Sequence, residues 1–342
     1  MHSDPSPATS TRYFNDSMAD LDLSRIARES LALLPTPIHQ APRLSAELGI
    51  PVWFKRDDLT GLGLGGNKIR PLEFLLGDAC ARGCDVLVTG SGAQSNWSML
   101  AALAARRCGL DSIVCFYGDA PDEIRGNLLL QGLTGSDLRW TGDASRASVD
   151  VMIEQVADDL RAQGRNPLVV PRGGATARGS LGYLNAAAEI AQQAAMLGVS
   201  DANLWLATGS CGTQGGLVAG VAAGFLPQVT GVTVSRPAEE CYRRVLELAT
   251  GAADLAATSA PTPAMVNIID GYIGPGYGYA SEEGNQAAAL VARTEGLFLD
   301  PPFCAKGMAA LIAAARAGQI DGPVIFLISG GAPTLFVQDG AL

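Results

Sequence analysis

The feature that most constrains this sequence is an alternation between short apolar runs and Ala- and Leu-rich segments of helical length. The apolar runs are rich in Val, Ile and Leu, and include DVLVTG, DSIVCFYG, NPLVVP, NLWLATG, GVTVS and PVIFLISGG. Strands that alternate with helices form parallel sheets covered by helices. The sequence therefore predicts an α/β fold. No segment resembles a flexible linker, so we expect any second domain to be an insertion.

Composition and charge narrow the class of protein. The 342 residues are 48% hydrophobic and 17% charged, which allows a large buried core. A formal net charge of -10, with no long run of Lys or Arg, argues against nucleic-acid and anionic-membrane partners. No apolar run approaches the roughly 20 residues of a membrane span, and residues 1–20 lack the layout of a secretory signal. We expect a cytoplasmic protein with a polar N-terminal tail.

Cysteine and histidine offer little for metal binding. The only histidines are His2 and His39, and the seven cysteines show no metal-type pairing. We therefore expect no metal site and favour buried free thiols. Acid–base chemistry must then come from Lys, Tyr, Ser, Cys or carboxylates.

Three junctions between a strand, a loop and a helix carry the candidate chemistry, because ligands collect beyond the carboxyl ends of parallel strands. The first is NLWLATGSCGTQGGLVAG, in which glycines and hydroxyls from Thr208 to Thr213 precede a small-residue helix. This loop predicts a phosphate cradle, with a plain tight turn as the alternative. It has neither the Gly-Lys-Ser/Thr ending of a Walker loop nor the spacing of a dinucleotide site.

The second junction is DVLVTGSGAQSNWSML, where Gln94, Ser95 and Asn96 stand at the expected helix start. Ser and Asn are ordinary helix caps, and the same donors could hold a substrate carboxylate. Both interpretations stay open from the sequence alone.

The third junction is LGLGGNKIRPLEF, residues 62–74, with Lys68 directly behind glycines that let a ligand approach the backbone. Gly61, Gly63 and Gly66 match G-x-G-x-x-G, but the preceding FKRDDLT is too charged to be expected as a buried strand, so a dinucleotide site is disfavoured. Lys68 alone could be a surface charge. Beside a phosphate loop and carboxylate donors, it indicates an amine that forms a Schiff base with an aldehyde cofactor.

Several motifs in one order carry a family resemblance: GGNKIRPLEFLL, GSGAQSNW, GNLLL, ATGSCGTQGG, GYIGPGYGYASEEG, EGLFLDPPFCAKGMAAL and LISGGAPTLF. Together they resemble the pyridoxal-phosphate (PLP) enzymes of the tryptophan-synthase-β fold type, fold type II. The match is closest to the branch of D-cysteine desulfhydrase and 1-aminocyclopropane-1-carboxylate (ACC) deaminase. It covers about residues 33–338.

The resemblance implies PLP as cofactor, a homodimer, and two open, twisted, mainly parallel sheets flanked by helices. It implies that a smaller α/β domain, residues 73–185, is inserted into a larger PLP-binding domain, residues 33–72 and 186–342. Residues 1–32 would form the tail.

The resemblance also implies roles for individual residues. Lys68 would bind the cofactor and move the Cα proton. Gln94, Ser95 and Asn96 would hold the substrate carboxylate, with Asn96 also facing the 3′ oxygen of the cofactor. Ser329 would bond the pyridine nitrogen, and Tyr277 would lie near the substrate. The phosphate loop would consist of Thr208, Gly209, Ser210, Cys211, Gly212 and Thr213.

Three residues depart from the pattern of the branch. Phe303 replaces a tyrosine, Cys304 stands where the deaminases place a glutamate and the desulfhydrases a threonine, and Trp97 replaces a polar residue. The loss of a phenol and a carboxylate argues against cyclopropane ring opening. Phe303 and Trp97 would line the substrate site, with a core role as the alternative for Trp97, and Cys304 and Tyr277 are candidates to assist the leaving group.

The predicted function is β-elimination on a small α-amino acid, giving a 2-oxo acid and ammonia, with Lys68 and Ser95 in the catalytic set. β-Replacement and racemisation or rearrangement at Cα remain alternatives within PLP chemistry. A protein that binds PLP or an amino acid without catalysis is the alternative from another class.

Overall fold

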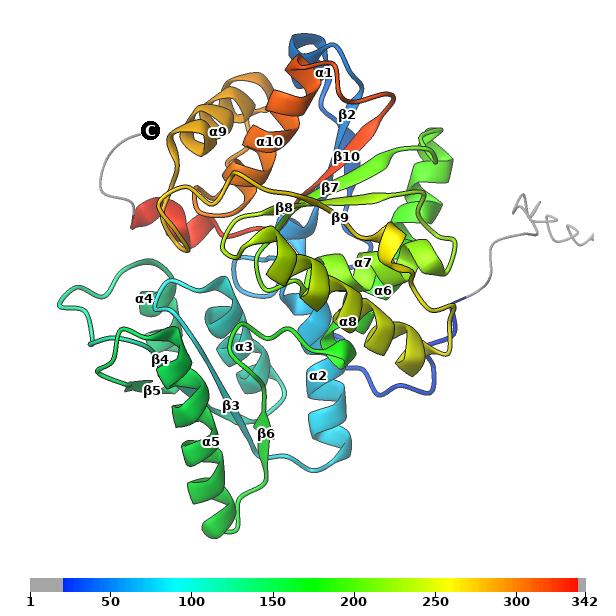
Figure 1. The fold of residues 1–342 in the computed structure, drawn as a ribbon. Helices are drawn as coiled ribbons and strands as arrows, with labels where there is room; N and C mark the ends of the chain where they lie inside the picture. The colour runs from blue at the N-terminus through cyan, green and yellow to red at the C-terminus, as the bar shows by residue number, and fades with distance from the viewer. Residues whose placement is uncertain (1–20, 338–342) are drawn as a thin grey trace, which may run out of the picture.

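The computed structural model describes residues 21–337 and contains two separate β-sheets (Figure 1). The first sheet has the order β1-β2-β10-β7-β8-β9, and all neighbours are parallel except β1 and β2. Its strands are β1 (Ile38–Gln40), β2 (Val52–Arg56), β7 (Asn203–Thr208), β8 (Val229–Thr233), β9 (Asn267–Ile269) and β10 (Val324–Ile328). The second sheet, of order β5-β4-β3-β6, is entirely parallel. Its strands are β3 (Val86–Ser91), β4 (Asp111–Phe116), β5 (Asp137–Trp140) and β6 (Pro167–Val169).

Helices connect and cover both sheets. They are α1 (Pro42–Leu48), α2 (Ile69–Ala81), α3 (Asn96–Arg107), α4 (Gly126–Leu133), α5 (Arg146–Ala162), α6 (Ala177–Leu197), α7 (Gly212–Ala222), α8 (Ala238–Ala256), α9 (Glu282–Glu295) and α10 (Cys304–Arg316). Short 3-10 turns lie at Asp57–Leu59, Pro263–Met265 and Ala332–Phe336. None of the helices within residues 21–337 is long and apolar enough to cross a membrane.

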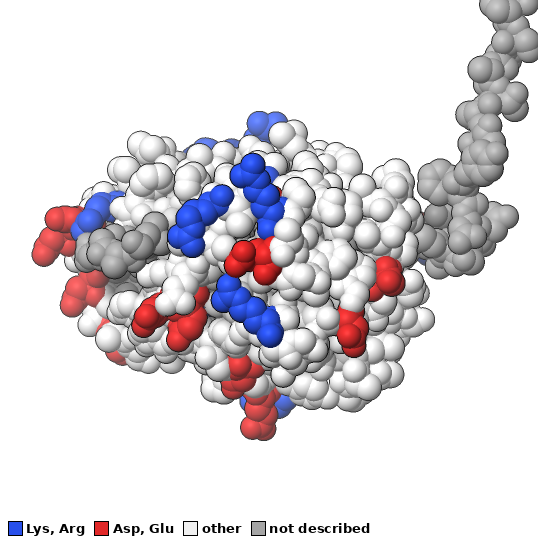
Figure 2. Space-filling model, turned by 90° about the horizontal axis from the view of Figure 1, so that it is seen from above, with Lys and Arg blue, Asp and Glu red and all other residues white. Residues whose placement is uncertain are grey.

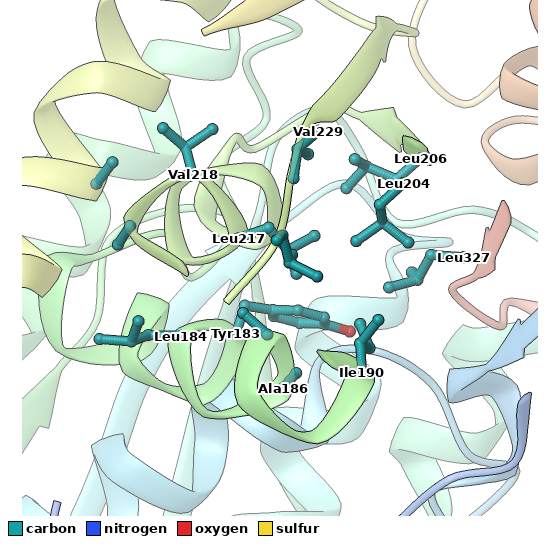
Figure 3. Packing of buried hydrophobic residues seen from close by; sticks show 14 of the residues in the cluster. Tyr183, Leu184, Ala186, Ile190, Leu204, Leu206, Leu217, Val218, Val229 and Leu327 are labelled. Atoms are coloured by element: carbon teal, nitrogen blue, oxygen red, sulfur yellow. The ribbon is translucent and has the colours of Figure 1, made fainter. Parts of the chain in front are cut away.

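The first sheet is covered on both faces, which explains why β10 is buried along its whole length. Helices α6, α7 and α8 pack on one face, while α1, α9 and α10 pack on the other. Figure 3 shows Tyr183 and Ile190 of α6 and Leu217 of α7 against Leu204 of β7 and Leu327 of β10. Burial on both faces is typical of parallel strands and accounts for their continuous apolar runs.

The second sheet, at the lower left of Figure 1, has the same layered construction. Helices α2 and α3 pack on one face and α5 on the other. The chain enters this sheet after β2 and returns to the first sheet at β7. The two sheets agree with the predicted fold class. The proposed domain boundaries remain a prediction.

The predicted N-terminal tail falls partly outside the structure, because residues 1–20 lie outside the described residues. Within residues 21–32, Arg28 forms an ion pair with Glu73 of α2 at 2.6 Å. The other oxygen of Glu73 accepts hydrogen bonds from the backbone N–H groups of Leu31 and Ala32, both at 2.9 Å. This segment is therefore held against α2.

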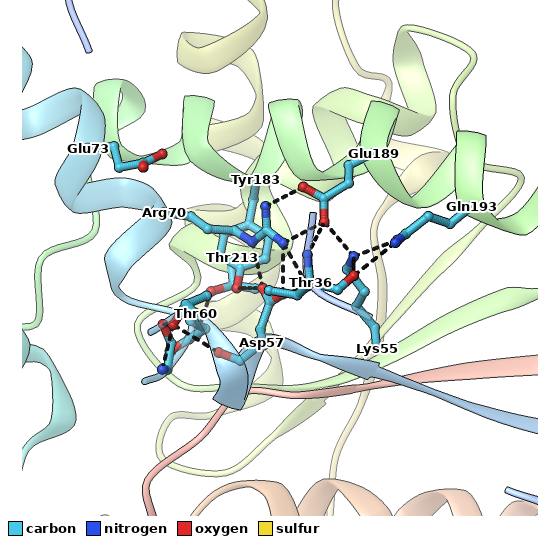
Figure 4. A network of polar contacts seen from close by, with 12 residues as sticks. Thr36, Lys55, Asp57, Thr60, Arg70, Glu73, Tyr183, Glu189, Gln193 and Thr213 are labelled. Carbon is cyan, nitrogen blue, oxygen red and sulfur yellow. Dashed lines mark hydrogen bonds and ion pairs between the residues drawn. The ribbon is translucent and has the colours of Figure 1, made fainter. Parts of the chain in front are cut away.

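The expectation that FKRDDLT cannot contain a buried strand is wrong. Residues 52–56 form β2, and Lys55 is fully buried. Its charge is paired, because Nζ lies 2.5 Å from Glu189 Oε1 and 2.7 Å from Gln193 Oε1 (Figure 4). Asp57 in turn pairs with Arg70 at 2.8 Å. Buried charges that are paired and hydrogen-bonded can be accommodated in a strand, so the charge count alone misled the prediction.

Candidate active site

The three glycine- and hydroxyl-rich junctions line one large pocket. It encloses about 920 Å³ of space not filled by atoms, part of it open to solvent. The start of α2, the start of α3, the loop between β7 and α7, and the end of β10 all contribute to its wall. The predicted site residues that line it are Lys68, Ser95, Asn96, Trp97, Thr208, Gly209, Ser210, Cys211, Thr213, Tyr277, Phe303 and Ser329. Gly212 lines a small adjoining pocket together with Lys68 and Ser210.

Lys68 is positioned by the glycine-rich turn before α2. Gly65 has φ +72°, and a Cβ there would lie 1.9 Å from the carbonyl oxygen of Asp58, so only glycine fits. Asn67 anchors the end of the turn, because its N–H donates to Ser329 O at 2.8 Å and its side-chain amide donates to Thr213 Oγ1 at 3.0 Å. The start of α2 is thereby tied to two walls of the pocket.

Within the described chain, the Lys68 amine has one hydrogen-bond partner, Ser210 Oγ at 3.3 Å. Burial lowers its pKa to about 8, and the nearby Cys211 thiol opposes this shift. No Asp or Glu of the described chain lines the pocket, so no carboxylate holds this amine in the charged form. A substantial neutral fraction near pH 8 makes Lys68 a nucleophile and a base.

The loop from Thr208 to Thr213 ends at the N-terminus of α7. The first N–H groups of a helix have no intrahelical partner and carry the positive end of the helix dipole. Cys211 has φ 75°, which turns the chain sharply into Gly212. Arg236 lies on the same wall and donates from Nε to Gly209 O at 3.1 Å. Unpaired N–H donors, hydroxyls and a guanidinium together fit a phosphate group.

The start of α3 combines capping with exposure to the pocket. Ser95 is the N-cap, and its hydroxyl accepts from the N–H of Trp97 at 3.2 Å. Asn96 accepts from the Asn127 amide at 2.7 Å, which fixes its orientation. Both residues also line the pocket. Capping and ligand binding are therefore compatible at this helix start.

The side chain of Gln94 makes contacts within the protein, and its predicted contact with substrate stays a prediction. Its side chain is outside the pocket lining and accepts from the N–H of Asn127 at 3.0 Å. Its amide nitrogen donates to the carbonyl oxygen of Arg125, also at 3.0 Å. Because both polar atoms of its side chain take part in these hydrogen bonds, Gln94 links the start of α3 to the start of α4.

The position of Trp97 fits both interpretations that the sequence left open, a core residue and a residue of the pocket wall. It is 2% exposed, its indole N–H donates to Thr89 Oγ1 at 2.9 Å, and it also contributes to the pocket lining. The ring fits closely under Gly174, where an added Cβ would lie 2.3 Å from a ring carbon. Trp97 is thus a core residue that forms part of the pocket wall.

Cys304 is placed behind Ser329 and does not line the pocket. It is fully buried, with Sγ 3.0 Å from Ser329 Oγ and 3.2 Å from the Ser329 nitrogen. Burial and the neighbouring Asp300 raise the pKa of the Cys304 thiol well above its usual value. A buried neutral thiol is poorly placed to assist a leaving group. The structure shows contact of Cys304 with Ser329, and its predicted catalytic role stays a prediction.

Tyr277 and Phe303 form an aromatic wall, with ring centroids 5.6 Å apart. Burial raises the pKa of Tyr277, while a hydrogen bond with Ser95 acts in the opposite direction. Lys306 fixes the preceding loop by donating from Nζ to Ile273 O at 2.7 Å and Gly276 O at 3.1 Å. The phenol of Tyr277 is therefore held in the pocket, next to the start of α3.

The sequence analysis missed several lining residues, among them Tyr117, Arg146, Arg172 and Arg236. Tyr117 and Arg172 follow the ends of β4 and β6, so the rule that ligands gather at strand ends could have found them. Arg146 begins α5 as the last residue of an unremarkable ASR sequence, and no local signal marks it as a pocket residue.

This fold and pocket define an α/β protein that presents a lysine and a phosphate-binding loop to one ligand. The family model for pyridoxal-phosphate dependent enzymes matches residues 29–330. The chain belongs to that family, and PLP is its cofactor. The predicted fold type and cofactor are confirmed.

Similar proteins indicate the branch of the family to which this chain is related. The chain is 38% identical, over 93% of its length and 95% of the other, to a provisionally named 1-aminocyclopropane-1-carboxylate deaminase of Pyrococcus abyssi. It is also 38% identical to D-cysteine desulfhydrase of Salmonella choleraesuis, over 92% and 97% of the two chains. A solved structure titled as an ACC deaminase homologue has a TM-score of 0.86 at 35% identity, covering 92% and 95%. The predicted branch and the class of PLP-dependent lyase or deaminase are confirmed.

Proposed function

We propose that this protein catalyses β-elimination on a small α-amino acid and releases a 2-oxo acid and ammonia. The names of its relatives support the reaction class. The observation that carries the proposal is the Lys68 amine, which faces the pocket without a carboxylate partner among the described residues and has a pKa lowered to about 8.

The cofactor is proposed to contact four parts of the pocket. The loop from Thr208 to Thr213 and Arg236 would hold its phosphate, Lys68 would bind its aldehyde carbon, Asn96 its 3′ oxygen and Ser329 its ring nitrogen. When bound, PLP supplies an electron sink that stabilises negative charge at Cα. A hydroxyl partner such as Ser329 leaves the ring nitrogen neutral more readily than a carboxylate would, which moderates that sink.

The amino-acid substrate is proposed to bind at the start of α3. Ser95 and Asn96 line the pocket there, at the positive end of a helix of 12 residues. That end favours an α-carboxylate. The hydrogen bond between Ser95 and Tyr277 would let the phenol take part in orienting the same carboxylate.

Lys68 is proposed to take the proton from Cα and to hold it while the substituent on Cβ leaves. A base with a pKa near the working pH combines a useful neutral fraction with sufficient driving force. Phe303 lies beside Tyr277 and has no proton to give. It would exclude water and shape the pocket, and Tyr277 is a phenol placed to aid departure of the β-substituent.

The test is to assay 2-oxo acid and ammonia from D- and L-amino acids that carry β leaving groups, using holoenzyme and a Lys68→Ala variant. The expected result is stoichiometric 2-oxo acid and ammonia from one or more substrates, lost in the variant. Formation of a new amino acid from an added thiol would indicate replacement. Solvent deuterium at Cα without 2-oxo acid would indicate racemisation. A change in cofactor absorbance with no product would indicate a binding protein, and each of these three results would overturn the proposal.

The proposal includes a homodimer in the cytoplasm, as the family resemblance implies. Leu33, Leu59 and Leu64 are 70%, 47% and 55% exposed and lie around the glycine-rich segment, where Leu33 packs against Gly61. Exposed apolar residues that cluster are typical of an interface between copies. Light scattering of the eluting protein would test this, and a monomeric mass would contradict it.

The two sheets also support the proposed domain division, with residues 73–185 as the inserted domain. Limited proteolysis would test it by showing whether cleavage concentrates near residues 73 and 185. Cleavage elsewhere would contradict those boundaries.

A further inference from the structure

The charges of the pocket differ from those of the rest of the protein. The chain carries 34 acidic and 24 basic residues, and Figure 2 shows both signs interspersed on one face. The described residues that line the pocket include Lys68, Arg146, Arg172 and Arg236 and no Asp or Glu. An acidic protein that lines one pocket with cations alone creates a local site for an anionic ligand.

Two of these cations have roles in the function proposed above. Lys68 is the base, and Arg236 lies at the loop where the cofactor phosphate would bind, with Nε bonded to Gly209 O. The α-carboxylate is accounted for by Ser95 and Asn96 at the start of α3. Arg146 and Arg172 therefore remain without an assigned anionic group of the cofactor or the substrate.

Arg172 lies in the loop after β6, and its position is fixed by contacts on both sides. The next residue, Gly173, bonds through its N–H to Gly90 O at 3.2 Å and lies close to Ser210. The Arg172 guanidinium donates Nε and Nη2 to Asp150, both at 3.2 Å, while its side chain remains 23% exposed. Its Nη1 takes no part in that ion pair, so donors remain for a ligand.

Arg146 is the first residue of α5, and its guanidinium carbon lies 4.6 Å from the ring centroid of Tyr277. It makes no ion pair or hydrogen bond with another residue in the range 21–337. The stacking fixes the guanidinium beside the proposed substrate site and leaves its five N–H donors free. Tyr117 lines the same pocket and adds a phenol.

We propose that Arg146 and Arg172 bind a second anionic group on the substrate, so that the preferred substrate is a small α-amino acid whose β-substituent is an oxyanion. A sulfonate and a phosphate ester are two such groups that can both bind there and leave. This inference rests on the proposed β-elimination and names its substrate class.

The reaction balances without an oxidant or a reductant. The Cα proton goes to Lys68, and the Cβ–S bond of a sulfonate or the Cβ–O bond of a phosphate ester breaks. The departing group keeps the electron pair and leaves as sulfite or phosphate. The remaining enamine takes up water and gives the 2-oxo acid and ammonia. The arginines stabilise the negative charge that moves onto the leaving group.

The first experiment compares turnover by holoenzyme of 2-amino-3-sulfopropanoate, O-phosphoserine and the neutral 2-amino-3-chloropropanoate, each as both enantiomers. Wild type, Arg146→Gln, Arg172→Gln and the matched control Arg161→Gln are assayed for 2-oxo acid. Arg161 lies in the last turn of α5, pairs with Asp158 and is outside the pocket lining.

The expected result is that each pocket variant lowers kcat/KM for an anionic substrate by about 10- to 100-fold, the range of one charged hydrogen bond, and changes the chloro substrate by less than about 3-fold. The faster of the two anionic substrates identifies the leaving group. An equal loss on charged and neutral substrates, or turnover of the neutral substrate alone, would overturn the inference while the proposed elimination stands.

A binding measurement separates the two proposals if no substrate is turned over. Calorimetric titration of the same holoenzymes with 2-amino-3-phosphonopropanoate and with alanine requires no elimination. Tighter binding of the phosphonate that falls about 10-fold or more in the pocket variants supports the anion site even where the reaction assignment fails. Equal binding of both ligands, unaffected by the variants, would overturn the anion site.

Discussion

Lys55 and Lys68 lie 13 residues apart and have opposite surroundings. Lys55 is fully buried, and its amine contacts Glu189, Gln193 and the carbonyl oxygen of Thr36 within 2.8 Å. Lys68 borders a pocket, and among residues 21–337 its amine hydrogen-bonds to Ser210 alone, at 3.3 Å. A lysine that pairs with a carboxylate, such as Lys55, stabilises the fold. A lysine in a pocket without a carboxylate, such as Lys68, is available for chemistry.

The carboxylates near Lys55 account for the difference between the two lysines. Figure 4 shows Glu189 between Lys55 and Arg70, with Asp57 held by Arg70 and Tyr183. Burial disfavours the charged form of Asp57, but the charge and hydrogen bonds of Arg70 outweigh it, so the pKa of Asp57 is lowered. For Lys68, burial is opposed only by Cys211, and its pKa falls to about 8.

The largest expected effect is loss of activity in Lys68→Ala. Removing the base and cofactor-binding amine should lower kcat/KM by at least about 10⁴-fold, the upper end for one acid–base group. The measurement is 2-oxo acid formation, with circular dichroism to establish that the fold is kept. Retention of a tenth of the activity in a folded, PLP-loaded variant would contradict the role of Lys68.

The second effect concerns stability. Glu189→Ala leaves buried Lys55 without its carboxylate partner and leaves Arg70 with Asp57 alone, which should lower the free energy of unfolding by about 3–5 kcal/mol. Urea denaturation measures this change. Gln192→Ala, on the exposed side of the same helix, serves as the control and should change stability by less than about 0.5 kcal/mol. Comparable losses in both variants would contradict the special role of the paired carboxylate.

The same network predicts a dependence of stability on acid. Burial opposes ionisation of Glu189, but Arg70 and Lys55 prevail and lower its pKa, as happens at Asp57. A carboxyl group whose folded pKa is depressed stabilises the fold above its unfolded pKa, near 4, and loses that contribution as pH falls through the folded value. The wild-type unfolding free energy should therefore fall more steeply below about pH 5 than that of Glu189→Ala.

Much of this site could be predicted from the sequence because its parts are local. Lys68 follows its own glycine turn, Ser95 caps its own helix, and the loop from Thr208 to Thr213 precedes α7 directly. Each pattern carries its structural consequence within a few residues. Their order along the chain indicated the family.

The side-chain positions that the sequence did not predict depend on contacts between distant segments. The burial of Lys55 requires Glu189, which lies 134 residues away, and the position of Cys304 depends on Ser329, which lies 25 residues away. Gln94 points to Asn127 because α4 packs against α3. Neither spacing nor composition encodes these partners, so the sequence alone assigned Gln94 and Cys304 to the ligand.

The third effect concerns the pH dependence of PLP uptake, which should reflect the pKa of Lys68 and not the surroundings of Lys55. Because burial lowers the pKa of Lys68 to about 8, its neutral fraction falls nearly tenfold for each pH unit below that value. The rate at which apoenzyme takes up PLP should therefore rise with pH and level off above about pH 8. Glu189→Gln, which removes the charge next to Lys55, should keep the same midpoint. A midpoint near the ordinary lysine pKa of about 10.4 would contradict the lowered pKa of Lys68.

The smallest effect is expected for Cys304→Ala. Its thiol lies behind Ser329, outside the pocket lining, and the variant removes one neutral contact to a hydroxyl that would face the cofactor ring. Such a bond contributes about 0.5–1.5 kcal/mol, so kcat/KM should fall by about 10-fold or less, with a small shift in cofactor absorbance. Cys115→Ala, a buried thiol of β4 away from the pocket, controls for the lost volume and should leave the absorbance unchanged. A loss above about 1,000-fold in a folded Cys304→Ala protein would restore a direct role for the thiol, because loss of one neutral contact cannot produce an effect of that size.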